Sequence, residues 1–127
     1  VYERQLQSRD ELSLSENTLV IFTSDNGPWL LMGDHGGSAG QLRAGKQFTF
    51  EGGMRVPMVA SWPGKIPAGI RPEGMATMMD WLPTFATLTG ASVPDDRPID
   101  GKDISGVLMG HNEREDQELF YYMSGQL

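Results

Sequence analysis

The stretch LVIFTSDNGPW, from Leu19 to Trp29, joins two unlike halves. Residues 19–23 are apolar and rich in β-branched side chains without alternation, which is typical of a strand covered on both faces. Two side chains that carry oxygen, Asp25 and Asn26, follow almost at once, and a Gly-Pro break comes next. The stretch therefore predicts a strand whose carboxyl end presents polar groups, in an α/β fold.

Two interpretations of Asp25 and Asn26 stand at this point. An Asn-Gly pair is a strong hairpin signal with residues 29–32 as the return strand, although Pro28 has no N–H to donate to that pairing. Alternatively, open α/β sheets bind ligands at the carboxyl ends of their strands, and both side chains offer the hard oxygens that Ca²⁺ or Mg²⁺ prefers. The local sequence leaves turn and metal site open.

Outward from this stretch, strand and helix signals alternate around a long glycine-rich loop over residues 27–53, and loops of that length are usually functional. We expect Asp80 to be the N-cap of a helix, because Pro83 is tolerated only in a first turn, and Gly90 to end that helix. The expected elements are a helix over 1–12, strands over 19–23, 56–62 and 75–79, helices over 80–88 and 103–109, and a strand over 120–123.

Composition excludes several classes of function. The chain has 127 residues and a net charge of -7, which argues against nonspecific binding to nucleic acid. No apolar run approaches the roughly 20 residues of a membrane span. The absence of cysteine removes disulfides, thiolate metal sites and a cysteine nucleophile. Because the chain begins at Val1, we expect a processed product or a fragment.

Two side chains of the long loop are candidates for contact with an anion. Gly40–Gln47 nearly matches a phosphate-binding P-loop, but Gln47 replaces the final hydroxyl residue and no helix is expected to follow. Lys46 then remains either an ammonium that approaches an oxyanion or a solvated surface lysine. His35 is expected either to touch substrate or to lie at the surface.

Five motifs taken together resemble the arylsulfatase family, in order from about Asn17 to Leu108. They are TSDNGPW, GGSAGQLRAGKQFTFEGGMRVP, SWPGKIPAG, MDWLPTFATLTG and IDGKDISGVL. The resemblance implies an α/β fold, a partial alkaline-phosphatase-like sandwich whose mixed, mostly parallel sheet has flanking helices. It also implies that residues 1–127 are a single segment of a catalytic domain. The family's nucleophile motif, C/S-x-P-x-R, has no match, since SWPGK at 61–65 carries Lys in place of Arg.

The resemblance implies hydrolysis of a sulfuric ester with bound Ca²⁺ and a formylglycine that lies outside this chain. By matching position, Asp25 and Asn26 resemble two Ca²⁺ ligands, and Lys46 resembles the catalytic lysine that holds a sulfate oxygen. Glycines 36, 37, 45, 52 and 53 resemble positions that shape the pocket wall.

The expected partner is a sulfated small molecule or sulfated sugar, and exposed sheet edges are expected to favour self-association. The family suggests a periplasmic, extracellular or lysosomal location. Two alternatives stay open: a phosphoester or phosphonate hydrolase of the same superfamily, or a non-catalytic fragment that binds an anion.

Overall fold

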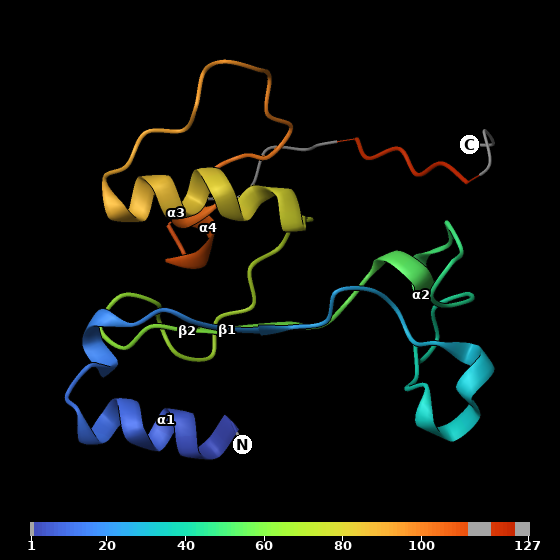
Figure 1. The fold of residues 1–127 in the computed structure, drawn as a ribbon, viewed down its shortest axis with the longest axis horizontal. Helices are drawn as coiled ribbons and strands as arrows, with labels where there is room; N and C mark the ends of the chain where they lie inside the picture. The colour runs from blue at the N-terminus through green and yellow to red at the C-terminus, as the bar shows by residue number, and fades with distance from the viewer. Residues whose placement is uncertain (1, 112–117, 124–127) are drawn as a thin grey trace. The chain divides into compact units, whose positions relative to one another are not determined.

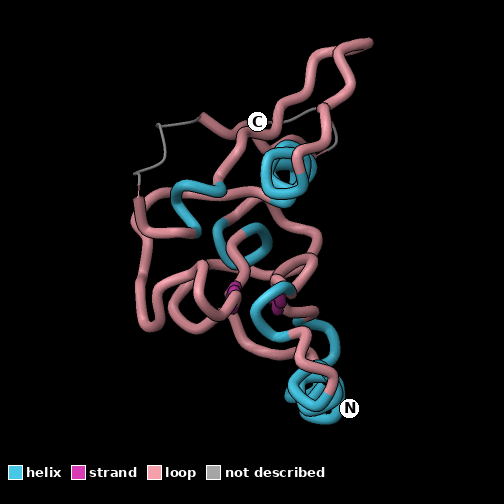
Figure 2. Tube along the Cα trace, turned by 90° about the vertical axis from the view of Figure 1, so that its left-hand side faces the viewer, coloured by secondary structure: helices cyan, strands magenta, loops and turns pink. Residues whose placement is uncertain are grey.

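The computed structural model describes residues 2–111 and 118–123, and its sheet is an antiparallel pair of strands, β1 (Val20–Thr23) and β2 (Met58–Ser61) (Figure 1). Loops make up most of the chain (Figure 2), as expected from 16 glycines and 8 prolines. The other elements are the α-helices α1 (Tyr2–Glu11), α2 (Glu51–Met54), α3 (Trp81–Thr89) and α4 (Ser105–Leu108) and the 3₁₀ helices η1 (Ser15–Asn17), η2 (Leu30–His35) and η3 (Met78–Asp80).

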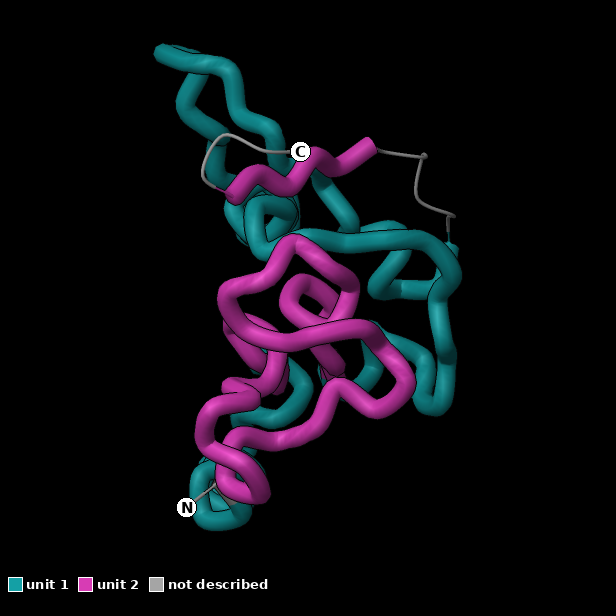
Figure 3. The backbone as a smooth tube through the Cα atoms, turned by 90° about the vertical axis from the view of Figure 1, so that its right-hand side faces the viewer, with its two compact units in different colours: residues 1–19, 61–117 teal, residues 20–60, 118–127 magenta. Residues whose placement is uncertain are grey.

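The chain divides into two units (Figure 3). Unit 1 comprises residues 1–19 and 61–117, and unit 2 comprises residues 20–60 and 118–127. Asp25, Asn26, His35 and Lys46 all belong to unit 2. No helix in the described part of the chain is long and apolar enough to cross a membrane.

The two strands run in opposite directions. The hydroxyl of Thr23 donates to the carbonyl of Pro57 at 3.0 Å, and four residues further on the N–H of Gly27 donates to the carbonyl of Gly53, four residues earlier than Pro57. The two segments are therefore antiparallel. A mostly parallel sheet is not what the described residues show, because the long loop folds back directly into β2.

Unit 1 is organised around the fully buried carboxylate of Asp80. One carboxylate oxygen accepts the N–H of Thr77 at 2.6 Å, and the other accepts the N–H of Lys102 at 2.8 Å. Asp80 occupies the N-cap position of α3, as the sequence predicts, but its side chain makes no capping hydrogen bond to that helix. It reaches back to Thr77, where η3 begins, and across to a segment 22 residues later.

A second buried polar side chain, Thr84, extends this network into the helical core. Its hydroxyl donates to the carbonyl of Asp80 at 2.6 Å and accepts the N–H of Ile104 at 3.0 Å. Ile104 lies with Ala86 and Leu108 in the small apolar core. The network therefore joins α3 to the segment that leads into α4, and the packing of these helices follows from it.

The helix ends largely follow the sequence pattern. Gly90 adopts φ 72° after α3, and the N–H of Ala91 bonds to the carbonyl of Ala86 at 2.9 Å, which is a Schellman-type ending. Gly110, also at φ 72°, follows α4. The predictions of the helices over 1–12, 80–88 and 103–109 are confirmed with shorter bounds at the ends of two of them.

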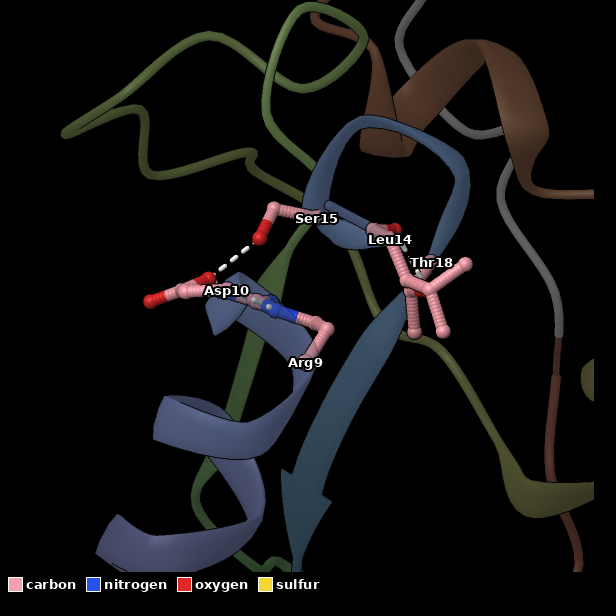
Figure 4. A network of polar contacts seen from close by, with 5 residues as sticks. All are labelled: Arg9, Asp10, Leu14, Ser15 and Thr18. Atoms are coloured by element: carbon pink, nitrogen blue, oxygen red, sulfur yellow. Dashed lines mark hydrogen bonds and ion pairs between the residues drawn. The ribbon is translucent and has the colours of Figure 1, made fainter. Parts of the chain in front are cut away.

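The segment after α1 is held by side-chain contacts (Figure 4). The carboxylate of Asp10 accepts hydrogen bonds from the hydroxyl of Ser15 and from the guanidinium of Arg9, and the hydroxyl of Thr18 donates to the carbonyl of Leu14 at 2.7 Å. The Ser15 bond first, and the Arg9 bond next, lower the pKa of Asp10. These contacts turn the chain from α1 towards β1.

Two expected strands are not found. Residues 75–79 were expected to be extended, but Met78 and Met79 belong to η3, because the Thr77–Asp80 contact closes a helical turn there. Among the described residues of the last expected strand, 120–123, only Met123 makes an isolated bridge. The strands over 19–23 and 56–62 are confirmed as β1 and β2.

Candidate functional site

The candidate site lies in a glycine-rich lobe, residues 24–53, that extends β1 and returns towards β2. Its neck is the contact between Gly27 and Gly53, whose N–H and carbonyl are 3.0 Å apart (N···O). A Cβ atom added to Gly27 would lie 1.8 Å from the carbonyl oxygen of Gly52, so only glycine fits at this position. The neck therefore brings the residues after β1 against those before β2.

The segment Pro28–Trp29 is the base on which the rest of the lobe is assembled. The carbonyl of Pro28 accepts the N–H of Lys46 at 2.8 Å, and the N–H of Trp29 donates to the carbonyl of Gly36 at 3.0 Å. The hairpin interpretation of this stretch is wrong, because η2 and not a return strand follows Trp29. The base ties Lys46 to a point two residues beyond Asn26.

The glycines of the lobe are needed for close backbone contacts. A Cβ atom would fall 2.1–2.4 Å from a carbonyl oxygen at each of four positions, Gly36, Gly45, Gly52 and Gly53, and Gly37 has φ 85°. All five glycines named by the family resemblance therefore have a steric or conformational reason. The sequence pattern marks Gly27 as part of a hairpin signal and a Gly-Pro break, and does not indicate its close contact with Gly52.

Asp25 and Asn26 lie directly beyond the end of β1, as the sequence predicts. The Asp25 side chain is exposed and Asn26 is half-buried. The backbone carbonyl of Asn26 accepts a hydrogen bond from the hydroxyl of Ser24 at 2.9 Å. The carboxylate of Asp25 and the amide oxygen of Asn26 are donors of the type that Ca²⁺ takes.

These donors fit part of a Ca²⁺ site. Ca²⁺ takes six to eight oxygen ligands, and Asp25 and Asn26 supply two side chains. Among residues 2–111 and 118–123, no group of three or more His, Cys, Asp or Glu side chains lies close enough together to hold a metal ion. The lobe therefore offers one side of a coordination sphere.

Lys46 projects from a turn whose backbone is unusual. Its neighbours Ala44 and Gln47 have φ values of 63° and 78°, a region that residues with a Cβ atom rarely enter. The P-loop interpretation is wrong, because turns follow Lys46 and the next helix, α2, begins only at Glu51. The side chain of Lys46 is exposed.

His35 ends η2, where its side chain is exposed. Gly33, two residues earlier, kinks this 3₁₀ helix with φ 52° and ψ -131°. The structure thus places His35 on the same lobe as Lys46, and its contact with a substrate stays a prediction.

A described cavity lies elsewhere. It has a volume of about 540 Å³ and belongs to unit 1, with Trp62, Lys65 and Phe85 among the residues that line it. None of the four predicted site residues lines this cavity. The side chains of Asp25, His35 and Lys46 are exposed, so the candidate site presents them to solvent at an open rim of loops.

Comparisons with known proteins agree on one family. The family model described as Sulfatase matches residues 7–91. N-acetylgalactosamine-6-sulfatase of Canis lupus familiaris is 46% identical over 118 residues, which are 92% of this chain and 22% of that protein. Arylsulfatase A of Homo sapiens is 47% identical over 114 residues, which are 90% of this chain and 22% of that protein.

Solved structures give the same result. The PsFucS1 sulfatase from Pseudoalteromonas sp. matches with a TM-score of 0.82 at 34% identity, over 91% of this chain and 23% of that one. Ps i-CgsB in complex with k-i-k-neocarrahexaose matches with a TM-score of 0.76 at 36% identity, over 85% and 23%. The chain thus spans about a fifth of its relatives, and, since the family model covers most of it, the chain belongs to the sulfatase family.

Proposed function

We propose that this chain is part of the catalytic domain of a sulfuric-ester hydrolase and supplies one wall of its metal and sulfate site. The observation that carries the proposal is the 2.8 Å bond from the N–H of Lys46 to the carbonyl of Pro28. It fixes the backbone of a cationic residue to a point two positions beyond Asn26, next to the oxygen ligands Asp25 and Asn26. Membership of the sulfatase family supports the same assignment.

The chemistry follows from the charge of a sulfate ester. During hydrolysis negative charge remains on the transferring sulfuryl oxygens, and an ammonium preorganised beside them stabilises that charge. Lys46 carries such a charge, and the 2.8 Å bond fixes its backbone rather than its side chain, which keeps all three donors of the ammonium for an anion. Lys46 is thus the residue that binds and orients the sulfate group.

Asp25 and Asn26 are proposed to hold Ca²⁺ together with ligands from other parts of a longer sulfatase. The bound cation would supply further positive charge against the sulfuryl oxygens. Within such a protein, β1 and β2 would join a larger, mostly parallel sheet. Val59 on β2 is 65% exposed although it is an apolar strand residue, which supports further cover over one face of this sheet in the longer protein. The isolated chain would then be prone to self-association.

A sulfated sugar is the substrate class that the relatives favour. One relative is named as an N-acetylgalactosamine-6-sulfatase, and one similar structure holds a neocarrahexaose. An open rim such as this lobe admits a bulky alcohol, because the sulfate group alone needs to reach Lys46. His35, exposed on the same lobe, is proposed to contact the part of the substrate beyond the sulfate.

The test uses a full-length sulfatase that carries this sequence, with turnover of an aryl sulfate as the readout. Lys46→Ala and Asp25→Ala are each expected to lower kcat/KM by about 10² or more, as the loss of one preorganised charge stabiliser does elsewhere. Lys65→Ala is the matched control, since Lys65 is an exposed loop lysine of unit 1 and is expected to leave the rate unchanged.

Full activity in the Lys46 or Asp25 variant would refute the proposal, and faster turnover of an aryl phosphate than of the sulfate would assign the site to phosphoester hydrolysis. A second readout does not require turnover. When the 127-residue chain is titrated with Ca²⁺, the NMR signals of Asp25 and Asn26 are expected to shift with an affinity no tighter than about 1 mM, because most ligands are missing.

A further inference from the structure

We propose that Arg43 is a positioning residue for Lys46 and acts by stacking on Phe50. The guanidinium carbon of Arg43 lies 3.7 Å from the centroid of the Phe50 ring, which is contact distance for a cation over an aromatic face. Arg43 precedes Lys46 by three residues, and Phe50 follows it by four. The inference rests on the proposed function, because it concerns how the proposed sulfate-binding lysine is held.

The stacked pair closes the turn that carries Lys46. The carbonyl of Arg43 accepts the N–H of Gly52 at 2.8 Å, so backbone and side chain of Arg43 both contact the segment Phe50–Gly52. Inside this closure, the N–H of Phe48 donates to the carbonyl of Gly45 at 3.1 Å. Lys46 therefore lies in a short loop that is fastened at both of its ends.

The turn needs such fastening because its backbone is strained. Ala44 and Gln47, on either side of the Gly45–Lys46 pair, both have positive φ values, which are unfavourable for residues that carry a Cβ atom. Residues in such conformations persist when the surrounding structure over-determines them. The Pro28–Lys46 bond fixes the turn from one side, and the Arg43–Phe50 stack fixes it from the other.

Charge explains why a guanidinium suits this place. Arg43 and Lys46 are both cations, and none of the ion pairs among residues 2–111 and 118–123 includes Arg43. The ring face attracts the guanidinium, which is planar and weakly hydrated, whereas a lysine ammonium would stack less well. The ring of Phe50 thus orients the Arg43 side chain, and the positive charge of Arg43 remains within the lobe.

The first experiment measures amide hydrogen exchange by NMR on the 127-residue chain. Phe50→Leu keeps an apolar side chain but removes the ring face, and it is expected to speed exchange at the Lys46 and Gly52 amides about two- to fivefold. Phe50→Tyr retains the ring and is expected to restore the rates, while Leu108, in unit 1, is unchanged in both variants. Unaltered exchange at Lys46 in Phe50→Leu would overturn the inference.

The second experiment measures kinetics in a full-length sulfatase that carries this sequence. Phe50→Leu is expected to lower kcat about two- to fivefold with little change in KM, and to have no further effect in a Lys46→Ala background, because it acts through Lys46. An equal loss in both backgrounds would overturn the role of the stack and leave the proposed function intact. If Lys46→Ala itself has no effect on kcat/KM, the proposed function fails.

Discussion

Unit 1 and the lobe of unit 2 differ in the kind of hydrogen bond that stabilises each of them. In unit 1, buried side chains bind backbone groups: the carboxylate of Asp80 and the hydroxyl of Thr84 join α3 to the segment before α4. In the lobe, backbone binds backbone, and glycines let carbonyls approach. A region held by its backbone leaves its side chains available, so the lobe can present Asp25 and Lys46 to solvent without losing its shape.

The largest effect is expected at Asp80. Asp80→Ala leaves the part-buried N–H groups of Thr77 and Lys102 without this acceptor, and hydrogen bonds to charged groups contribute roughly 1.5–3 kcal/mol each. We expect a loss of about 3–5 kcal/mol in the free energy of unfolding, measured by chemical denaturation. Asp80→Asn, which keeps one carbonyl oxygen, should lose less. A loss below about 1 kcal/mol for Asp80→Ala would mean that this side chain does not hold unit 1 together.

Gly27→Ala is the corresponding change in the lobe. The added methyl group would overlap the carbonyl of Gly52, and we expect a cost of about 3 kcal/mol. Amide exchange should accelerate at Gly27 and Lys46 but not at Leu108. Gly40→Ala is the comparison in the same lobe, because no atom lies within 4 Å of its Cβ position. Its φ of 60° adds backbone strain of about 1–2 kcal/mol, so its expected cost is smaller than that of Gly27→Ala. Equal effects of the two changes would show that backbone contact at the neck is unimportant.

Gln47→Gly is expected to stabilise the lobe. Gln47 has φ 78°, which strains a residue that carries a Cβ atom. Glycine relieves this strain but loses more conformational entropy on folding, and we expect a net gain in stability of about 0.5–1 kcal/mol. A matched Gln47→Ala variant keeps the strain and should show no gain. The measurement is the shift of the denaturation midpoint, and a lower midpoint for the glycine variant would contradict strain at this turn.

The smallest expected effect is the pH dependence of stability that arises from Asp103, just before α4. Burial alone would raise the pKa of Asp103, but hydrogen bonds from Ser105 and Thr87 outweigh it and hold this pKa below its ordinary value of 3.8. The contribution of Asp103 to stability is therefore complete above pH 3.8 and lost as the pH falls through the lower folded value. The amide signal of Ser105, followed by NMR from pH 6 to 2, should report the titration, and Asp103→Asn should abolish it. A midpoint above 3.8 would give the opposite sign.

Local signals predicted local structure well. The apolar run of β1 and the helix-ending Gly90 are encoded within a few residues, so both were found from the sequence. The bond from Asp80 to Lys102 could not be predicted from the sequence, because these residues are 22 positions apart and the local pattern indicated only a helix cap. Residues 75–79 were expected to form a strand for a similar reason, since nothing in the local pattern shows that the contact between Thr77 and Asp80 closes a turn.

The candidate site divides along the same line. Strand-end position pointed to Asp25 and Asn26, and glycine-flanked Lys46 stood out in its loop. The Pro28–Lys46 contact and the Arg43–Phe50 stack could not be predicted, since each depends on how the lobe closes upon itself. The antiparallel return into β2 was missed because a buried apolar run does not specify the direction of its neighbour.

The bond between Lys46 and Pro28 also bears on how this loop tolerates changes in length. Lys46 follows Asn26 by 20 positions in the sequence, yet the loop between them does not set the distance between these two residues. A residue inserted or deleted near Gly40, where the added atoms would meet open space, should leave that spacing as it is. Natural variation in loop length is therefore expected to concentrate between Gly37 and Leu42 and to be absent at Pro28 and Lys46.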